Sequence, residues 1–213
     1  MTTAAEFGQS VTGVGAIVKD CDRFGSIVQF HNATIADSIC DGVGADTESS
    51  TLNIGSGSTG VSIVNNTFRG AHSSFGGASI FRIVAYNLND ITGLLISGNV
   101  VVDCTSTYAA QISSAAADHI VATVTGNVIE GSTLRTGIQT AEATGVVRDC
   151  LVTGNQIEAL GREGIYWTGN DSALVDNHLA NNRQDAATSY DQLRVHGDRD
   201  NIQMNKVRGT QAR

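Results

Sequence analysis

Two glutamates are the side chains best placed to do chemistry, because both occupy the same position in a repeated sequence pattern. Glu130 and Glu158 each lie three residues after an Asn, and they are 28 residues apart. Stacked in register on adjacent strands, their backbones would lie about 4.8 Å apart. Carboxylates about 5 to 5.5 Å apart act as acid and nucleophile in retaining glycosidases. The pattern predicts a candidate catalytic pair, and two exposed side chains that splay apart in solvent are the alternative.

A second set of polar residues sits in the middle of short strands that precede this pattern. Their neighbours are mostly apolar, so the polar side chain faces outward when the neighbours face inward. Amide, guanidinium and phenol groups suit hydrogen bonding to a polar glycan, including an anionic one, with an aromatic face for the sugar. A solvated sheet surface is the alternative. The predicted substrate-binding residues are Asn53, Arg82, Gln139, Tyr166 and Arg194. Because Trp167 directly follows Tyr166, only one of these two rings can face outward.

The repeat that places these residues is centred on one Asn. With each Asn at position zero, positions −3 and +2 are large and apolar in all six copies, as expected for strands with one buried face. An earlier copy places Ala33 in the Asn slot, and successive copies are 22 to 33 residues apart. The six copies are centred on Asn66, Asn99, Asn127, Asn155, Asn177 and Asn205.

We assign the six repeated Asn residues to the fold and not to catalysis. Asn, often preceded by Gly, tolerates the left-handed backbone that a sharp corner can require. Stacked coils would also align the amides in a hydrogen-bonded ladder with a repeat of about 4.8 Å. Pro is absent from the chain, which fits strands that are paired on both sides. No segment carries the apolar stripe of an amphipathic helix.

With its Gly-Asn corners and segments such as LVTGNQIE and YDQLRVHGDRDNIQMNKVRG, the chain resembles the right-handed parallel β-helix proteins of the pectate-lyase-like superfamily. The resemblance covers residues 25 to 209 and implies an all-β solenoid of about seven or more coils, each of 22 to 33 residues. Residues 25–213 form the expected β-helix domain, and residues 1–24 form a cap or a first coil. The superfamily includes polysaccharide lyases, glycoside hydrolases, epimerases, and the trimeric tailspike and tail-fibre proteins of phages.

The resemblance implies two candidate functions. The favoured one is a carbohydrate-contacting module of a phage tail or virion spike, located on the virion or outside the cell and assembled as a homotrimer. The alternative is a polysaccharide-degrading enzyme. The sequence lacks the paired-Asp and Gly-His-Gly pattern of polygalacturonases, and it lacks the calcium-binding acidic set of pectate lyases. The last copy ends soon after Val207, and its open strand edges imply a contact with another chain, a further domain or a trimer partner.

Composition and spacing exclude several other classes. The net charge of −8 argues against nucleic acid as a partner. No apolar run is long enough to cross a bilayer, and the first residues do not form a signal peptide. No cofactor or metal site is expected, because the five His residues form no cluster with ligand spacing. The four Cys residues include no CxxC pair, so we expect buried free thiols in preference to two disulfides. They are Cys21, Cys40, Cys104 and Cys150.

Overall fold

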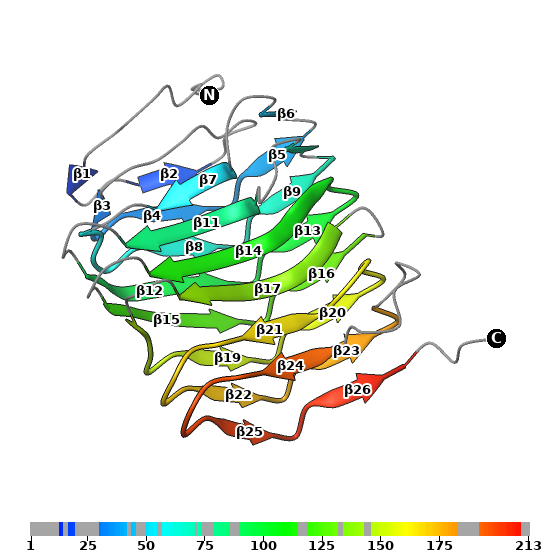
Figure 1. Ribbon diagram of the computed structural model, residues 1–213. Coiled ribbons are helices and arrows are strands. Elements are labelled where there is room, and N and C mark those ends of the chain that lie inside the picture. Colours follow the sequence, from blue (N-terminus) through cyan, green and yellow to red (C-terminus); the bar gives the residue numbers. More distant parts are fainter. Residues whose placement is uncertain are drawn as a thin grey trace.

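The computed structural model describes residues 13–14, 17–19, 30–41, 44–45, 50–54, 57–70, 72–73, 79–85, 90–114, 119–131, 134–142, 146–182 and 192–209. Over these ranges the chain is a right-handed parallel β-helix with three sheets along its length (Figure 1). The predicted all-β solenoid is therefore confirmed. Within the described ranges there is no helix, and so none that could span a bilayer.

Each coil passes from sheet 1 to sheet 2, turns at the Asn corner, enters sheet 3 and returns to sheet 1. Sheet 1 contains β7 (Ser50–Ile54), β11 (Ser79–Ala85), β14 (Ser106–Ser114), β17 (Leu134–Glu142), β21 (Ile165–Trp167) and β24 (Leu193–Val195). Sheet 2 contains β2 (Ile17–Lys19), β4 (Thr34–Ala36), β8 (Ser62–Val64), β12 (Ile91–Ser97), β15 (His119–Thr125), β18 (Val146–Val147), β19 (Leu151–Thr153), β22 (Ala173–Val175) and β25 (Asn201–Gln203). Sheet 3 contains β5 (Ile39–Asp41), β9 (Thr67–Arg69), β13 (Val100–Val102), β16 (Val128–Glu130), β20 (Gln156–Glu158), β23 (His178–Ala180) and β26 (Lys206–Arg208).

Two further parallel pairs lie toward the N-terminal end. They join β1 (Gly13–Val14) to β3 (Phe30–His31), and β6 (Gly44–Ala45) to β10 (His72–Ser73). Because β1 pairs with β3 and β2 pairs with β4, described parts of segment 1–24 continue the strand stacking. The division at residue 24 remains a prediction.

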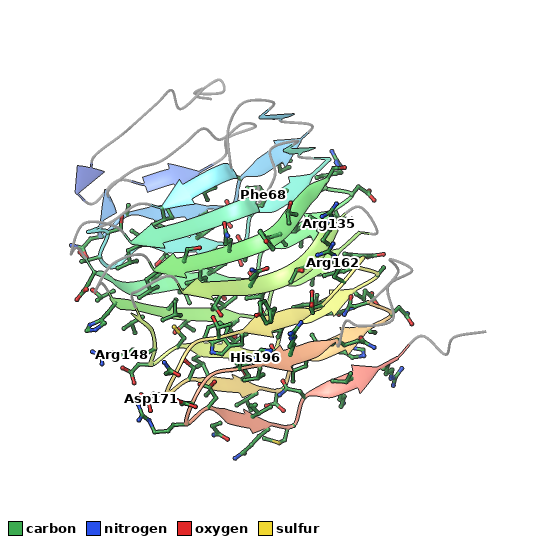
Figure 2. All side chains as sticks on the ribbon, viewed as in Figure 1. Phe68, Arg135, Arg148, Arg162, Asp171 and His196 are labelled. Carbon is green, nitrogen blue, oxygen red and sulfur yellow. The ribbon has the colours of Figure 1, made fainter. Side chains whose placement is uncertain are left out.

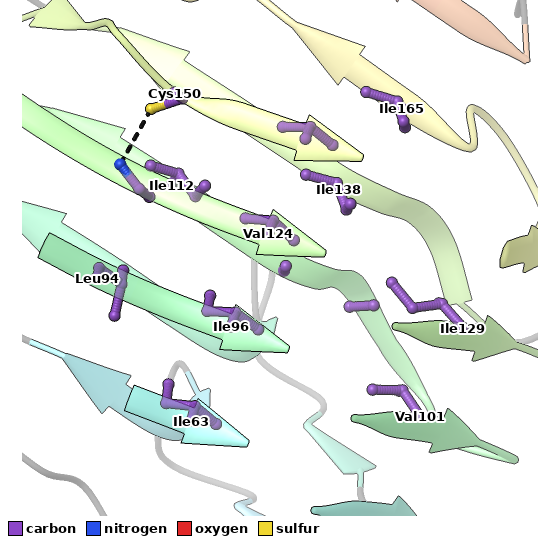
Figure 3. Close-up of a cluster of buried hydrophobic side chains, with 14 of the residues drawn as sticks. Ile63, Leu94, Ile96, Val101, Ile112, Val124, Ile129, Ile138, Cys150 and Ile165 are labelled. Atoms are coloured by element: carbon purple, nitrogen blue, oxygen red, sulfur yellow. Dashed lines mark hydrogen bonds between the residues drawn. The ribbon is translucent and has the colours of Figure 1, made fainter. Parts of the chain in front are cut away.

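The core is a set of apolar columns that run parallel to the axis, one inside each sheet (Figure 3). In sheet 2, Ile63, Ile96 and Val124 stack in register and are fully buried. In sheet 3, Phe68 and Val101 do the same. These are positions −3 and +2 of the repeat, so strand alternation alone determines which side chains enter the core.

The last coil is the exception to this burial. Ile202 occupies the sheet 2 column and Val207 the sheet 3 column, yet these side chains are 45% and 50% exposed. Met204, at the corner between them, is 68% exposed. The described C-terminal coil therefore presents apolar side chains and open strand edges on one end of the solenoid.

The Asn ladder forms as predicted, and Asn127 shows its pattern. Its Oδ1 accepts hydrogen bonds from the backbone N–H and the Nδ2 of Asn99, at 3.0 and 2.9 Å. Its Nδ2 donates to Asn155 Oδ1 at 2.9 Å and to the Ile96 carbonyl at 3.0 Å. The rungs at Asn66, Asn99, Asn155 and Asn177 repeat both side-chain donations, and Asn205 is the last described rung.

The left-handed residue at this corner is the one before the ladder Asn, and not the Asn itself. Gly98, Gly126 and Gly154 have φ of 64°, 62° and 62°, and Asn65 has φ of 55° in the same place. A Cβ on Gly98 would lie 2.5 Å from Asn65 Oδ1, which explains the Gly there. The bend is made one residue before the ladder Asn. The Asn therefore contributes to the corner through the hydrogen bonds of its amide.

The earliest copy of the repeat was placed five residues too early. Ile35 pairs with Ile63, so Ser38, and not Ala33, stands in the Asn slot. The Ser38 N–H donates to Asn66 Oδ1 at 3.1 Å, while its hydroxyl donates to the Ala36 carbonyl at 2.8 Å.

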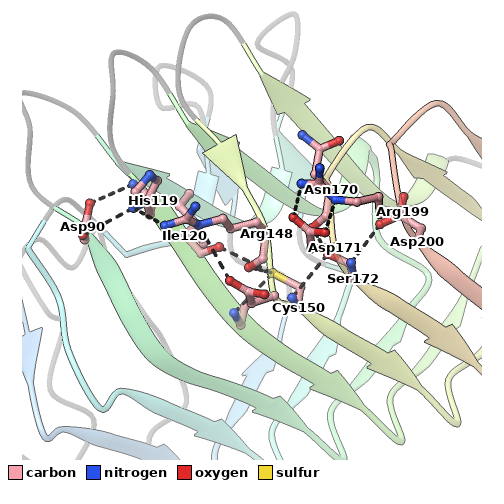
Figure 4. Close-up of polar contacts among 12 residues, drawn as sticks. Asp90, His119, Ile120, Arg148, Cys150, Asn170, Asp171, Ser172, Arg199 and Asp200 are labelled. Carbon is pink, nitrogen blue, oxygen red and sulfur yellow. Dashed lines mark hydrogen bonds and ion pairs between the residues drawn. The ribbon is translucent and has the colours of Figure 1, made fainter.

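A different polar stack lines the corner between sheets 1 and 2 (Figure 4). The Ala122 N–H donates to Cys150 Sγ at 3.3 Å, the Cys150 N–H donates to Ser172 Oγ at 3.3 Å, and the Ser172 N–H donates to Asp200 Oδ1 at 2.9 Å. Desolvation of the carboxyl group raises the pKa of Asp200 above its ordinary value. At this corner a thiol, a hydroxyl and a carboxylate each accept a hydrogen bond from a backbone N–H of the preceding coil, as the amide oxygen does at the Asn corner.

Two of the four cysteines are buried free thiols, as predicted, namely Cys104 and Cys150. The side chains of Cys21 and Cys40 lie outside the described residues.

Burial raises the pKa of Cys150 to about 12, and the thiolate is the form that reacts with alkylating reagents. Iodoacetamide at pH 8 should therefore leave Cys150 unmodified in the native protein and modify it in denaturant, as read by peptide mass spectrometry. Equal labelling in both states would contradict the burial of this thiol.

Candidate functional site

The residues of the predicted outward column are aligned by strand register on sheet 1. Arg82 pairs with Asn53, Gln139 with Tyr166, and Tyr166 with Arg194. The side chains of Asn53 and Arg82 lie outside the described ones, so only their strand register is known. Trp167 is in the core and Tyr166 is half-buried on the outside, which settles the choice between the two adjacent rings.

Sequence reasoning missed one member of this column. Gln111 pairs with Arg82 on one side and Gln139 on the other. The segment Ala110–Ile112 has the same apolar, polar, apolar alternation as its neighbours. Requiring one sheet 1 strand between each pair of ladder Asn residues would have found it.

Three predicted binding residues line one recess on the outer face of sheet 1. The recess has a volume of about 230 Å³ and gathers side chains from four successive coils. Figure 2 shows Arg135 and Arg162 one above the other on this face. The recess is lined by Thr107, Tyr108, Arg135, Thr136, Gln139, Arg162, Glu163, Tyr166 and Arg194.

Arg194 contacts three side chains around the recess. Its Nε donates to His196 Nε2 at 2.8 Å, and its guanidinium carbon lies 5.2 Å from the centroid of the Tyr166 ring. Its Nη1 is 4.0 Å from Glu163 Oε1. The His196 ring meets the Tyr166 ring edge-on, with centroids 5.8 Å apart. Hydrogen bonding and cation–π contact therefore fix the plane of the guanidinium group.

Glu163 is a carboxylate of the recess that sequence reasoning did not identify. Its side chain is only 7% exposed, and Oε2 accepts a hydrogen bond from Thr136 Oγ1 at 3.2 Å. It lies in the turn that leads from sheet 3 to sheet 1, together with Arg162. This turn has no fixed place relative to the ladder Asn, so the repeat gave no signal for it.

The two glutamates predicted as a catalytic pair are adjacent to each other on sheet 3, away from the recess on sheet 1. Glu130 and Glu158 are register partners in sheet 3, and neither lines the recess. The Glu158 Oε1 accepts a hydrogen bond from Gln156 Nε2 at 3.2 Å on an exposed surface. Stacking in register is thus as expected, and the catalytic role remains a prediction.

No cluster of three or more potential metal ligands occurs in the part of the chain that the structure describes. At the corner between sheets 1 and 2, Arg199 and Asp171 form an ion pair. Arg199 donates to both oxygens of Asp171 at 2.5 and 2.6 Å, and this hydrogen bonding lowers the pKa of the Asp171 carboxyl group.

No protein family and no curated protein matches the sequence. The structure is similar to that of the Dettilon tailspike protein, with a TM-score of 0.54 and 12% sequence identity. The chain shares its β-helix fold with that tailspike protein. The match covers 92% of this chain and 47% of the tailspike chain, so the chain spans about half the length of that protein. At this level of identity the β-helix is what the two proteins share.

Proposed function

We propose that the protein is a spike module of a phage virion that binds a surface polysaccharide through the recess on sheet 1. The observation that carries this proposal is the convergence of Gln139, Tyr166 and Arg194 in one hollow. Amide and guanidinium groups donate in fixed planes to hydroxyl and acid groups, and a half-buried aromatic ring offers area with little loss of conformational freedom. The likeness to a tailspike supports the virion setting.

Binding should depend on the recess and not on polar surface in general. Tyr166→Ala should weaken binding to a recognised polysaccharide about tenfold or more, because a half-buried Tyr is a typical binding hot spot. Gln139→Ala should weaken it about three- to tenfold, as expected for the loss of one or two hydrogen bonds. Glycan arrays followed by calorimetry on the recognised oligosaccharide measure both effects.

Gln203→Ala is the matched control, because Gln203 is an exposed amide on sheet 2, outside the recess. It should bind like the unmodified protein. If no polysaccharide binds, or if Gln203→Ala weakens binding as much as Gln139→Ala does, the recess is not the glycan site.

A polysaccharide-degrading enzyme is the second candidate, and Glu163 is the observation that favours it. A sheltered carboxylate beside Tyr166 and Arg194 could transfer a proton to or from a bound sugar. New reducing ends, or absorbance from unsaturated products, would reveal turnover of the polysaccharide. Loss of turnover in Glu163→Gln assigns the chemistry to the recess, while loss in Glu130→Gln or Glu158→Gln assigns it to the sheet 3 pair. Binding without turnover leaves a pure adhesion module.

The spike module should act as a homotrimer. The exposed side chains of Ile202, Met204 and Val207 form apolar surface of the kind that proteins normally cover. Light scattering should give three times the mass of the chain. A monomer at micromolar concentration would contradict the trimer without affecting the glycan proposal.

A further inference from the structure

The recess concentrates positive charge on an acidic protein. Three arginines and one glutamate line it, although the chain as a whole carries a net charge of −8. A local excess of cations in a hollow raises the concentration of anions there.

The arginines are also placed to donate to a ligand. The Nε–H of Arg194 donates to His196 and its Nη1 lies 4.0 Å from Glu163 Oε1. Other terminal N–H groups of Arg194 have no acceptor among the described residues and can donate to a ligand. Arg135 is exposed at the rim and makes no ion pair within the described ranges. A guanidinium group whose plane is already fixed loses little freedom when it binds a planar carboxylate through two parallel hydrogen bonds.

We propose that the recess recognises the acid group of a charged sugar, with Arg194 as its principal contact and Arg135 as a second one. This inference rests on the proposed glycan binding and narrows the substrate class to acidic polysaccharides. Tyr166 and His196 are positioning residues here, because they hold the Arg194 guanidinium group by ring contact and hydrogen bond. Hydroxyl groups of the bound glycan can reach Gln139, which lines the same recess two coils away from Arg194.

The test compares ligands that differ in charge, in the kind of acid group, or in having a peptide in place of a sugar backbone. Oligosaccharides of a hexuronic acid, their carboxyl-reduced neutral counterparts, sulfated neutral oligosaccharides and a polyaspartate peptide of equal charge are titrated into the full chain. We expect the hexuronic oligosaccharides to bind at least about tenfold more tightly than the reduced ones, as for a charge-assisted pair. Preferred binding of the sulfated ligands would assign the acid group to a sulfate.

The outcomes separate the two proposals. If the acidic and the neutral sugars bind equally, the acidic-sugar inference is overturned while glycan binding stands. If neither binds, the proposed function itself fails. If polyaspartate binds as well as the acidic sugar, the recess attracts charge without recognising a sugar, and the inference is again overturned.

Variants then locate the contact. Arg194→Gln should remove the preference for the acidic oligosaccharide, so that the acidic and the reduced oligosaccharides bind with equal affinity. Arg194→Lys keeps the charge and loses the paired donors, so it should recover only part of the preference. Arg199→Gln is the matched control, because Arg199 pairs with Asp171 at another corner. An unchanged preference in Arg194→Gln would overturn the assignment.

Discussion

Replacing Asn127 by Ala is expected to lower the free energy of unfolding by about 3 to 5 kcal/mol, a large share of the stability of an ordinary domain. The Asn127 amide makes four hydrogen bonds inside the solenoid. Its loss leaves the backbone N–H and one Nδ2–H of Asn99, and the Ile96 carbonyl, without those partners. Each buried polar group left unsatisfied costs about 1 to 3 kcal/mol.

The position of a rung along the ladder should determine the size of the effect. Asn205→Ala removes the same amide from the last described rung, where the side chain is partly exposed and water can replace it. We expect a loss of about 1 kcal/mol there. Urea unfolding followed by circular dichroism measures both variants. An equal loss at the two positions would show that the buried network is not what makes the ladder important.

Replacing Trp167 by Ala is expected to lower the free energy of unfolding by about 3 to 5 kcal/mol, the usual range for emptying an aromatic site. Trp167 is the single Trp of the chain and one of the largest fully buried side chains, with 0% exposure. Its fluorescence in the unmodified protein should therefore shift to longer wavelength on unfolding. Because the variants lack this fluorophore, their unfolding is followed by circular dichroism.

The variant Trp167→Phe distinguishes the contribution of the aromatic ring to stability from that of the indole N–H group. The buried Nε1 of Trp167 has no hydrogen-bond partner in the described structure, and a buried donor without a partner costs about 1 to 3 kcal/mol. Removing it offsets the lost ring volume, so Trp167→Phe should lie within about 1 kcal/mol of the unmodified protein. A loss as large as that of the Ala variant would mean that an acceptor meets this N–H in solution.

The repeat was sufficient to predict the fold because strand geometry is local and periodic. Once Asn99 and Asn127 defined equivalent positions, the alternation of side chains along each strand assigned Val101 and Val124 to the core and Gln139 to the outside. Parallel stacking then aligned Tyr166 with Arg194 without any knowledge of the third dimension. The placement of Ala33 instead of Ser38 came from a copy that has no Asn in the slot. The omission of Gln111 came from the coil between Asn99 and Asn127, for which no sheet 1 strand was assigned.

The sequence by itself determined the solenoid, its Asn ladder and the outward column on sheet 1. Only the tertiary structure decided that Arg135, Arg162 and Glu163 join this column in one recess, and that Glu130 and Glu158 stand apart from it. The physical reason is that pleating fixes the side of every strand residue, whereas turns between sheets vary in length and path from coil to coil. Arg162 and Glu163 belong to such a turn, and they meet Arg135 of β17 only when neighbouring coils are stacked.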